Sequence, residues 1–153
     1  MTTTEAAREA AVRDIVTRVA HHIDARDWSK LRSLYAERVT TDYTSLFGGE
    51  VQQQAADALI ETWRGVLGPL RATQHLLGPI SVLLDGDYAR AECHVRGYHY
   101  RDGLPGGSEW MVAGHYVFEL SVRDAGWQID AMTLHTYYQT GNRQLLEQAA
   151  QAR

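Results

Sequence analysis

The sequence predicts an α+β domain, because helical patterns occupy the first half of the chain and strand patterns most of the second. Apolar residues recur three or four positions apart between Val12 and Ile23, which is the spacing of one helix face. From about residue 80 onward, apolar and polar residues alternate in runs separated by Gly-containing turns, as in antiparallel strands. A chain of 153 residues fits one domain over residues 1–153, since single domains commonly hold about 100–150 residues.

Two helices are predicted before the first strand. The first runs from about Thr4 to Ile23, and its apolar stripe faces the core. The members of this stripe are Val12, Ile15, Val16, Val19 and Ile23. A second, short helix is expected from Trp28 to Tyr35, because the side-chain oxygen of Asp27 can accept hydrogen bonds from first-turn amides.

A strand and a third helix come next. The segment from Val39 to Phe47 alternates like a strand, and Gly48-Gly49 ends it. A helix is expected from Gln52 to Val66, and Gly68-Pro69 closes it. The side chains it would bury are Ala55, Leu59, Ile60 and Trp63.

The rest of the chain is mainly strand. Four strands are predicted: Ile80–Leu84, Tyr88–Arg101, Trp110–Val122 and Trp127–His135. The turn Asp85-Gly86-Asp87 marks the first two as a hairpin. The last segment, from Asn142 to Ala150, is expected to be a short helix that covers the sheet or the mouth of a pocket.

Composition and charge exclude several classes of protein. A net charge of −4 and a pI near 5.9 leave no basic stripe to neutralise a phosphate backbone, so nucleic acid is not an expected partner. The single cysteine, Cys93, cannot form an internal disulfide, and no apolar run approaches the roughly 20 residues of a membrane span. The N-terminus lacks the basic and then apolar order of a signal peptide. We therefore expect a cytoplasmic protein without membrane contact.

Alternation with a period of two assigns strand side chains to the faces of the sheet. The apolar side of the long strand carries Ala89, Ala91, Cys93, Val95 and His99. His99 is thus expected to point inward, unless a bulge at Gly97 turns it outward. Tyr43 is expected to point inward from the first strand, whereas His115 falls on the outer side of its own strand.

Asp24 lies at the end of the first helix, where the helix dipole disfavours a carboxylate unless a cation or a hydrogen-bond donor contacts it. A histidine can do so, because the carboxylate accepts from one ring nitrogen and makes the other a better base. His75 is the partner we expect, with His99 as the alternative. Taken singly, each residue also has an ordinary structural explanation: a helix-terminal Asp, a core or surface His, or, for Tyr43, a strand aromatic with a bonded hydroxyl.

Other kinds of site find less support in the sequence. The seven histidines do not converge on a metal: His21 and His22 are neighbours on a helix, and His94 and His99 fall on opposite faces of one strand. The chain has no Gly-rich phosphate loop and no Ser nucleophile elbow. Neither a metal nor a cofactor is expected.

Three segments follow one another along the chain: Ile23-Asp24-Ala25-Arg26-Asp27-Trp28-Ser29-Lys30-Leu31-Arg32, then Thr41-Asp42-Tyr43-Thr44-Ser45, then Thr73-Gln74-His75. In order and approximate spacing they resemble the scytalone dehydratase group of the SnoaL-like domains. That group belongs to the superfamily of nuclear transport factor two and ketosteroid isomerase. The resemblance runs from about Ile15 to about Leu134. It implies a cone-shaped roll of N-terminal helices packed on a strongly curved, mostly antiparallel sheet that encloses a pocket.

The resemblance also implies which residues are catalytic. In that group an Asp follows the first helix, a Tyr sits in the first strand, a His follows Thr-Gln, and a second His lies on a middle strand. The matching residues here are Asp24, Tyr43, His75 and His99. A related dehydrochlorinase keeps the Asp and the His that match Asp24 and His75, and uses them to remove a proton.

Two departures from the pattern concern the substrate. Ile23 stands where the scytalone enzyme has a Tyr, so a second phenol is missing at that position. The Ser and Asn that the enzyme carries on a later strand have no clear counterpart in Ala113–Phe118. Scytalone itself is therefore not the expected substrate.

The expected function is that of a cofactor-free, dehydratase-like lyase acting on an apolar cyclic or aromatic small molecule. His75, oriented by Asp24, would remove a proton next to a carbonyl group, and Tyr43 would hydrogen-bond the carbonyl oxygen. His99 would protonate the leaving hydroxyl. Two alternatives stay open: an isomerase or cyclase that uses the same pocket, and a non-catalytic domain that binds a small ligand.

A homo-oligomer, dimer or trimer, is also expected. Members of the family usually associate through the outer surface of the sheet. In this chain that surface is predicted to carry Tyr98, Tyr100 and His115 among charged side chains.

Overall fold

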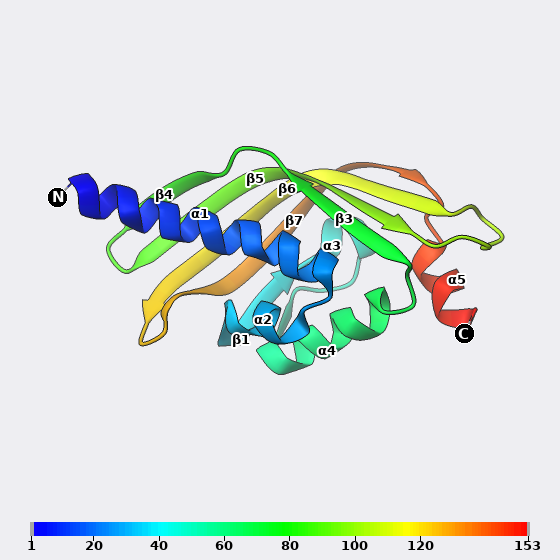
Figure 1. Cartoon of the computed structure of the whole chain (residues 1–153), viewed down its shortest axis with the longest axis horizontal. Coiled ribbons are helices and arrows are strands. Elements are labelled where there is room, and N and C mark those ends of the chain that lie inside the picture. The colour runs from blue at the N-terminus through cyan, green and yellow to red at the C-terminus, as the bar shows by residue number, and fades with distance from the viewer. Residues whose placement is uncertain (1, 153) are drawn as a thin grey trace.

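The computed structural model describes residues 2–152 as helices that cover one face of a curved sheet (Figure 1). The helices are α1 (Thr2–Ala25), α2 (Trp28–Ser33), α3 (Thr44–Phe47), α4 (Ala56–Leu67) and α5 (Leu145–Gln151). The strands are β1 (Tyr35–Asp42), β2 (Gln52–Ala55), β3 (Ala72–Leu77), β4 (Ser81–Asp85), β5 (Tyr88–Tyr100), β6 (Glu109–Arg123) and β7 (Gly126–Gly141). The predicted α+β class, with its curved and mostly antiparallel sheet, is confirmed.

The seven strands lie in the order β2-β1-β7-β6-β5-β3, and β4 pairs with β5 as well. Within the described part of the chain, every pairing is antiparallel except that of β1 with β7. Shifts of register leave Asp130 and Tyr137 of β7 without partners on β6, and such bulges bend a sheet. At the second bulge, a Cβ on Gly114 would lie 2.5 Å from the carbonyl oxygen of His135, so only glycine fits this close approach.

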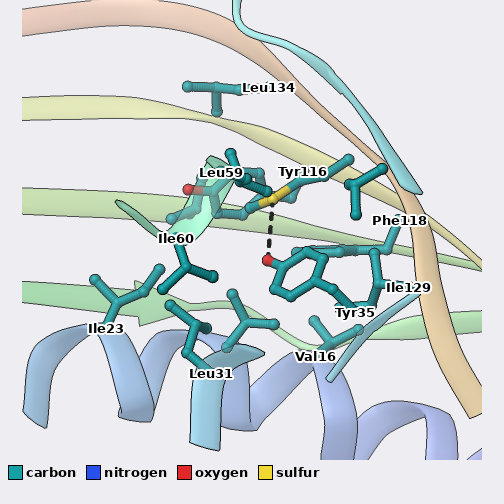
Figure 2. Close-up of a cluster of buried hydrophobic side chains, with 14 of the residues drawn as sticks. Val16, Ile23, Leu31, Tyr35, Leu59, Ile60, Tyr116, Phe118, Ile129 and Leu134 are labelled. Carbon is teal, nitrogen blue, oxygen red and sulfur yellow. Dashed lines mark hydrogen bonds between the residues drawn. The ribbon is translucent and has the colours of Figure 1, made fainter. Parts of the chain in front are cut away.

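Both predicted N-terminal helices are present, although their ends differ from the predicted ones. Asp27 caps α2, because its Oδ1 accepts a hydrogen bond from the backbone nitrogen of Lys30 at 3.2 Å. The helix is shorter than expected, since it ends at Ser33 and Tyr35 already begins β1. The ring of Tyr35 is completely buried and its hydroxyl donates to Sδ of Met132 at 3.5 Å, the dashed line in Figure 2.

The core lies between α1 and the concave face of the sheet (Figure 2). Val12, Val16, Val19 and Ile23 of α1 are all buried, as the predicted stripe requires. The inward row of β5 is buried too, and its members are Ala89, Ala91, Cys93, Val95 and His99. Burial of each large apolar side chain stabilises the fold by roughly 1.5–3 kcal/mol.

The predicted strand from Val39 to Phe47 is wrong at its end. Strand β1 stops at Asp42, and Thr44–Phe47 forms the short helix α3. Local hydrogen bonds explain the change, because Oδ1 of Asp42 accepts from the backbone nitrogen of Thr44 at 3.0 Å and from its hydroxyl at 2.7 Å. Tyr43 therefore precedes a helix and does not belong to a strand.

The predicted helix from Gln52 to Val66 is wrong at its start. Gln52–Ala55 forms strand β2, which pairs with β1 at the edge of the sheet, and α4 begins only at Ala56. Ala55 is exposed in consequence, whereas the neighbouring Ala56 is buried. Pairing with β1 overrides a local sequence that favours a helix.

Candidate active site

A cavity of about 100 Å³ lies between the helices and the inner face of the sheet. Its walls are mostly apolar and aromatic, and its polar side chains are Tyr43, His75, His99 and Tyr116. Phe47 and Val66 line the cavity and yet are 63% and 39% exposed, so they mark its mouth. Leu146 of α5 lines the same cavity, in agreement with the predicted position of this helix.

Asp24 and His75 form the expected pair. Oδ1 of Asp24 lies 2.7 Å from Nδ1 of His75, although 51 positions separate the two residues in the chain. Oδ2 of Asp24 accepts from the backbone nitrogen of His75 at 2.8 Å, and the hydroxyl of Thr73 donates to Oδ1 at 2.9 Å. Three hydrogen bonds from β3 thus fix the carboxylate at the end of α1.

These contacts determine the charge of Asp24. Burial alone would raise the pKa of this carboxyl, but the hydrogen bonds from His75 and Thr73 and the attraction of the imidazole outweigh it, so the pKa is lowered. An ionised Asp24 accepts the proton on Nδ1 of His75 and leaves Nε2 as the basic nitrogen. Nε2 lies on the cavity side of the ring, beside Gly97. Asp24 itself stands behind His75 and is not part of the cavity wall.

His99 points inward as predicted, because the pairing of β5 with β6 runs through Gly97 without a bulge. The ring stacks on Trp110 with centroids 4.5 Å apart, and Nδ1 lies 3.3 Å from the carbonyl oxygen of Trp110. Burial first, and the neighbouring His75 second, lower the pKa of His99 to about 4. His99 is therefore a neutral imidazole near pH 7. With Nδ1–H directed at Trp110, its Nε2 is an acceptor.

This buried neutral histidine should make stability depend on pH. Unfolding restores a pKa near 6.5, above the folded value of about 4, so the unfolded chain binds more protons between these two values and stability falls as the pH drops through them. Once the pH is well below 4, this difference in pKa lowers the free energy of unfolding by about 3 kcal/mol.

We expect His99→Gln to flatten the dependence of the free energy of unfolding on pH between 6.5 and 4.5, measured by urea titration. His21→Gln, at an exposed position on α1, is the matched control. An equally steep loss of stability in His99→Gln would contradict the assignment.

Two phenols also line the cavity. The hydroxyl of Tyr43 is 3.7 Å from Sδ of Met132, a weak acceptor, and Tyr116 of β6 lines the same cavity. Burial first, and the neighbouring phenols second, place the pKa of Tyr43 well above its ordinary value. Burial likewise raises the pKa of Tyr116 to about 12. Both groups are thus protonated donors at any physiological pH.

The structure brings Tyr43, His75 and His99 to one cavity and adds Asp24 behind it. Tyr116 is a residue that the sequence analysis did not select for the site, although it lies on the inward row of its strand. It supplies a second phenol to the cavity, which Ile23 cannot. His115 lies on the outer face as predicted, where its Nε2 is 2.8 Å from Oε1 of Glu92.

Within residues 2–152, no three His, Cys, Asp or Glu side chains are grouped so as to hold a metal ion. In the same part of the chain, no helix has the length and apolar character that crossing a membrane requires.

The sequence profile of the SnoaL-like domain family matches residues 4–133, and the chain belongs to this family. Among curated proteins, none shows significant similarity to it. Solved structures share its fold over most of their length. A Kribbella flavida protein has 25% sequence identity and a TM-score of 0.86, and the match covers 94% of this chain and 99% of that one.

Two more distant structures bear the names of enzymes. A candidate scytalone dehydratase from Novosphingobium aromaticivorans is 20% identical, with a TM-score of 0.79 and coverage of 92% of this chain and 91% of that chain. The hexachlorocyclohexane dehydrochlorinase LinA-type3 from Novosphingobium barchaimii is 16% identical, with a TM-score of 0.78 and coverage of 92% and 94%. At these identities the comparison shows a shared fold.

Proposed function

We propose that this protein is a lyase that removes water from a compact, mostly apolar ring compound carrying a hydroxyl group β to a carbonyl. The observation that carries the proposal is the pair of Asp24 and His75, with the free nitrogen of His75 on the wall of an apolar cavity. A base in such a place can act on a carbon acid that the cavity shields from water. A dehydratase candidate and a dehydrochlorinase of the same fold support elimination as the reaction.

The proposed reaction needs one proton carrier. Nε2 of His75 takes the proton from the carbon next to the carbonyl, and the electrons of that C–H bond form the C=C bond as the C–O bond breaks. The resulting imidazolium, stabilised by Asp24, returns the proton to the departing hydroxide, and water leaves. Tyr43 donates to the carbonyl oxygen while negative charge develops there.

The part of His99 in this proposal differs from the one predicted from the sequence. A group with a pKa of about 4 carries almost no acidic proton near pH 7, so His99 is a poor general acid. Its unprotonated nitrogen can instead accept a hydrogen bond from the hydroxyl of the substrate. The proton for the leaving group then comes from His75.

The experiment is incubation of the protein with 3-hydroxycyclohexanone, a single ring with the required groups, in D₂O and with EDTA present. We expect cyclohexenone to form faster than it does in the same solution without the protein. Its formation is measured by its ultraviolet absorbance. Deuterium incorporation next to the carbonyl without loss of water would instead favour an isomerase or cyclase. Neither elimination nor exchange, on this compound or on its aromatic analogues, would favour a binding domain and contradict the proposal.

We also propose that the protein is a dimer or trimer that associates through the outer face of the sheet. Tyr137, Tyr138 and Leu76 are 60%, 48% and 50% exposed there, next to Arg96 and His94. Exposed apolar and aromatic side chains gathered on one face are typical of an interface.

Light scattering at micromolar concentration should give a mass of two or three chains. Tyr138→Asp should shift the population toward monomer, because it places a charge among the aromatic side chains. Val51→Asp, at an exposed apolar residue just before β2, is the control and should leave the mass unchanged. A monomeric wild-type protein would overturn the proposal.

A further inference from the structure

Arg26 makes the turn that ends α1. Its backbone nitrogen donates to the carbonyl oxygen of Ile23 at 3.0 Å. The backbone nitrogen of Asp27 donates to that of His22 at 2.9 Å, and this pair of bonds is a Schellman motif. Arg26 has a φ of 58°, and within residues 2–152 no other residue except glycine has a positive φ. Glycine usually occupies such a position, because a Cβ is disfavoured there, so the reason for an arginine lies in its side chain.

The guanidinium of Arg26 contacts the turn that leads from α4 into β3. Nη1 donates to the carbonyl oxygen of Gly68 at 3.0 Å, and Nη2 donates to that of Leu70 at 2.6 Å. Gly68 lies at the C-terminus of α4, where the helix dipole also favours a cation. A planar guanidinium can serve two acceptors in this way, whereas a lysine cannot. These contacts hold Arg26 in a backbone conformation that is otherwise unfavourable.

The same two parts of the chain carry the pair of Asp24 and His75. Asp24 lies two residues before Arg26, and its carboxylate accepts from Thr73 and His75 of β3. Strand β3 is fixed in the sheet by its backbone pairing with β5, whereas α1 only packs beside it (Figure 1). Among the hydrogen bonds of the described chain, those that join the end of α1 to residues 68–77 are made by Asp24 and Arg26.

We propose that Arg26 is a positioning residue, whose guanidinium holds the end of α1 at the distance from β3 that lets Asp24 accept the proton on Nδ1 of His75. Arg26 is not among the residues that line the cavity, so it acts through this pair. The pair is sensitive to displacement, because Oδ1 and Nδ1 lie 2.7 Å apart and a hydrogen bond requires both a short distance and a good angle. The effect of Arg26 on turnover rests on the proposed function, whereas its effect on this hydrogen bond does not.

Arg26→Gly tests the proposal, because glycine adopts a φ of 58° without strain and the change removes the guanidinium. We expect kcat for 3-hydroxycyclohexanone to fall about tenfold or more, since a displacement of about 1 Å can cost roughly 10²-fold. KM should change little, because Arg26 does not line the cavity. Arg26→Lys keeps the charge and can donate to one of the two carbonyl oxygens, so it should recover part of the loss.

Arg13→Ala is the matched control. Arg13 also lies on α1, and its Nε donates to the carbonyl oxygen of Ile80, just before β4, at 3.2 Å. This is the same kind of contact between α1 and the start of a strand, but β4 carries no residue of the cavity wall. The turnover of Arg13→Ala should therefore stay near that of the wild type.

NMR of protein with ¹⁵N-labelled histidine measures the pair directly and needs no substrate. In the wild type, the Nδ1 proton of His75 should give a resonance that is protected from exchange by the hydrogen bond to Asp24. This resonance should be lost in Arg26→Gly, present but weakened in Arg26→Lys, and unchanged in Arg13→Ala.

A purely structural Arg26 would give another result. Arg26→Gly would then have a lower melting temperature, but its Nδ1 resonance and its kcat would equal those of the wild type, and the proposal would be overturned. Equal loss of the resonance in Arg13→Ala, or its absence from the wild type, would overturn it as well. If Arg26→Gly does not fold, the resonance and kcat of Arg26→Lys decide in the same way.

Failure of this proposal can be distinguished from failure of the proposed function. Loss of the resonance in Arg26→Gly, in a protein that dehydrates nothing, would support the role of Arg26 and end the lyase assignment. Dehydration at an unchanged rate in a folded Arg26→Gly would do the reverse.

Discussion

Replacing His75 by alanine should lower the turnover of 3-hydroxycyclohexanone by about 10²–10⁴-fold, the contribution of a positioned general base. Asp24→Asn should cause a loss of similar size. An amide cannot accept from the ring nitrogen and the backbone nitrogen of His75 with both of its polar atoms, so one donor loses its partner. The double variant should be little worse than either single one, because residues that act as a unit are strongly non-additive.

His21→Ala is the matched control for these variants, since His21 is an exposed histidine on α1, outside both the cavity and the proposed interface. Circular dichroism should show that each variant is folded. Asp24→Asn also weakens the attachment of β3 to α1, so its melting temperature should be measured beside its rate. Full activity in His75→Ala would rule out the proposed base and leave His99 as the candidate.

Periodicity was sufficient to predict the parts of the fold that bury one continuous face. The inward row of β5 is buried at every expected position, and so is the stripe of α1 except for Ile15, which is only half-buried. The errors fall where a local or an edge interaction decides the structure. The sequence of strand β2 predicts a helix, because its residues are Gln and Ala. The strand forms because it pairs with β1.

In the site too, some features could be predicted from the sequence, whereas others depend on contacts between segments that are far apart in the chain. The position of Asp24 at a helix end indicated that it needed a donor, and the resemblance to the scytalone dehydratase group indicated His75. Tyr116 could be placed inward by alternation, but nothing in the sequence shows that its side chain lines the same cavity as His75. The neutral state of His99 depends on burial against Trp110, which only the folded chain reveals.

Tyr43→Phe should lower kcat by about 10²-fold where the cavity excludes water, and by less where water can replace the hydroxyl, because one donor to the developing oxyanion is lost. The loss should appear equally in kcat and in kcat/KM, since this hydrogen bond strengthens only in the transition state. Tyr116→Phe tests whether the second phenol shares that task. If it does, its loss should resemble that of Tyr43→Phe.

Tyr35→Phe is the matched control, because Tyr35 makes the same kind of hydrogen bond to Sδ of Met132 and yet lies outside the cavity wall. Its turnover should stay near that of the wild type, and its melting temperature should fall slightly with the loss of a weak hydrogen bond. A Tyr35→Phe variant as slow as Tyr43→Phe would show that the phenols act by packing around Met132. In that case the oxyanion donor must be sought elsewhere on the cavity wall.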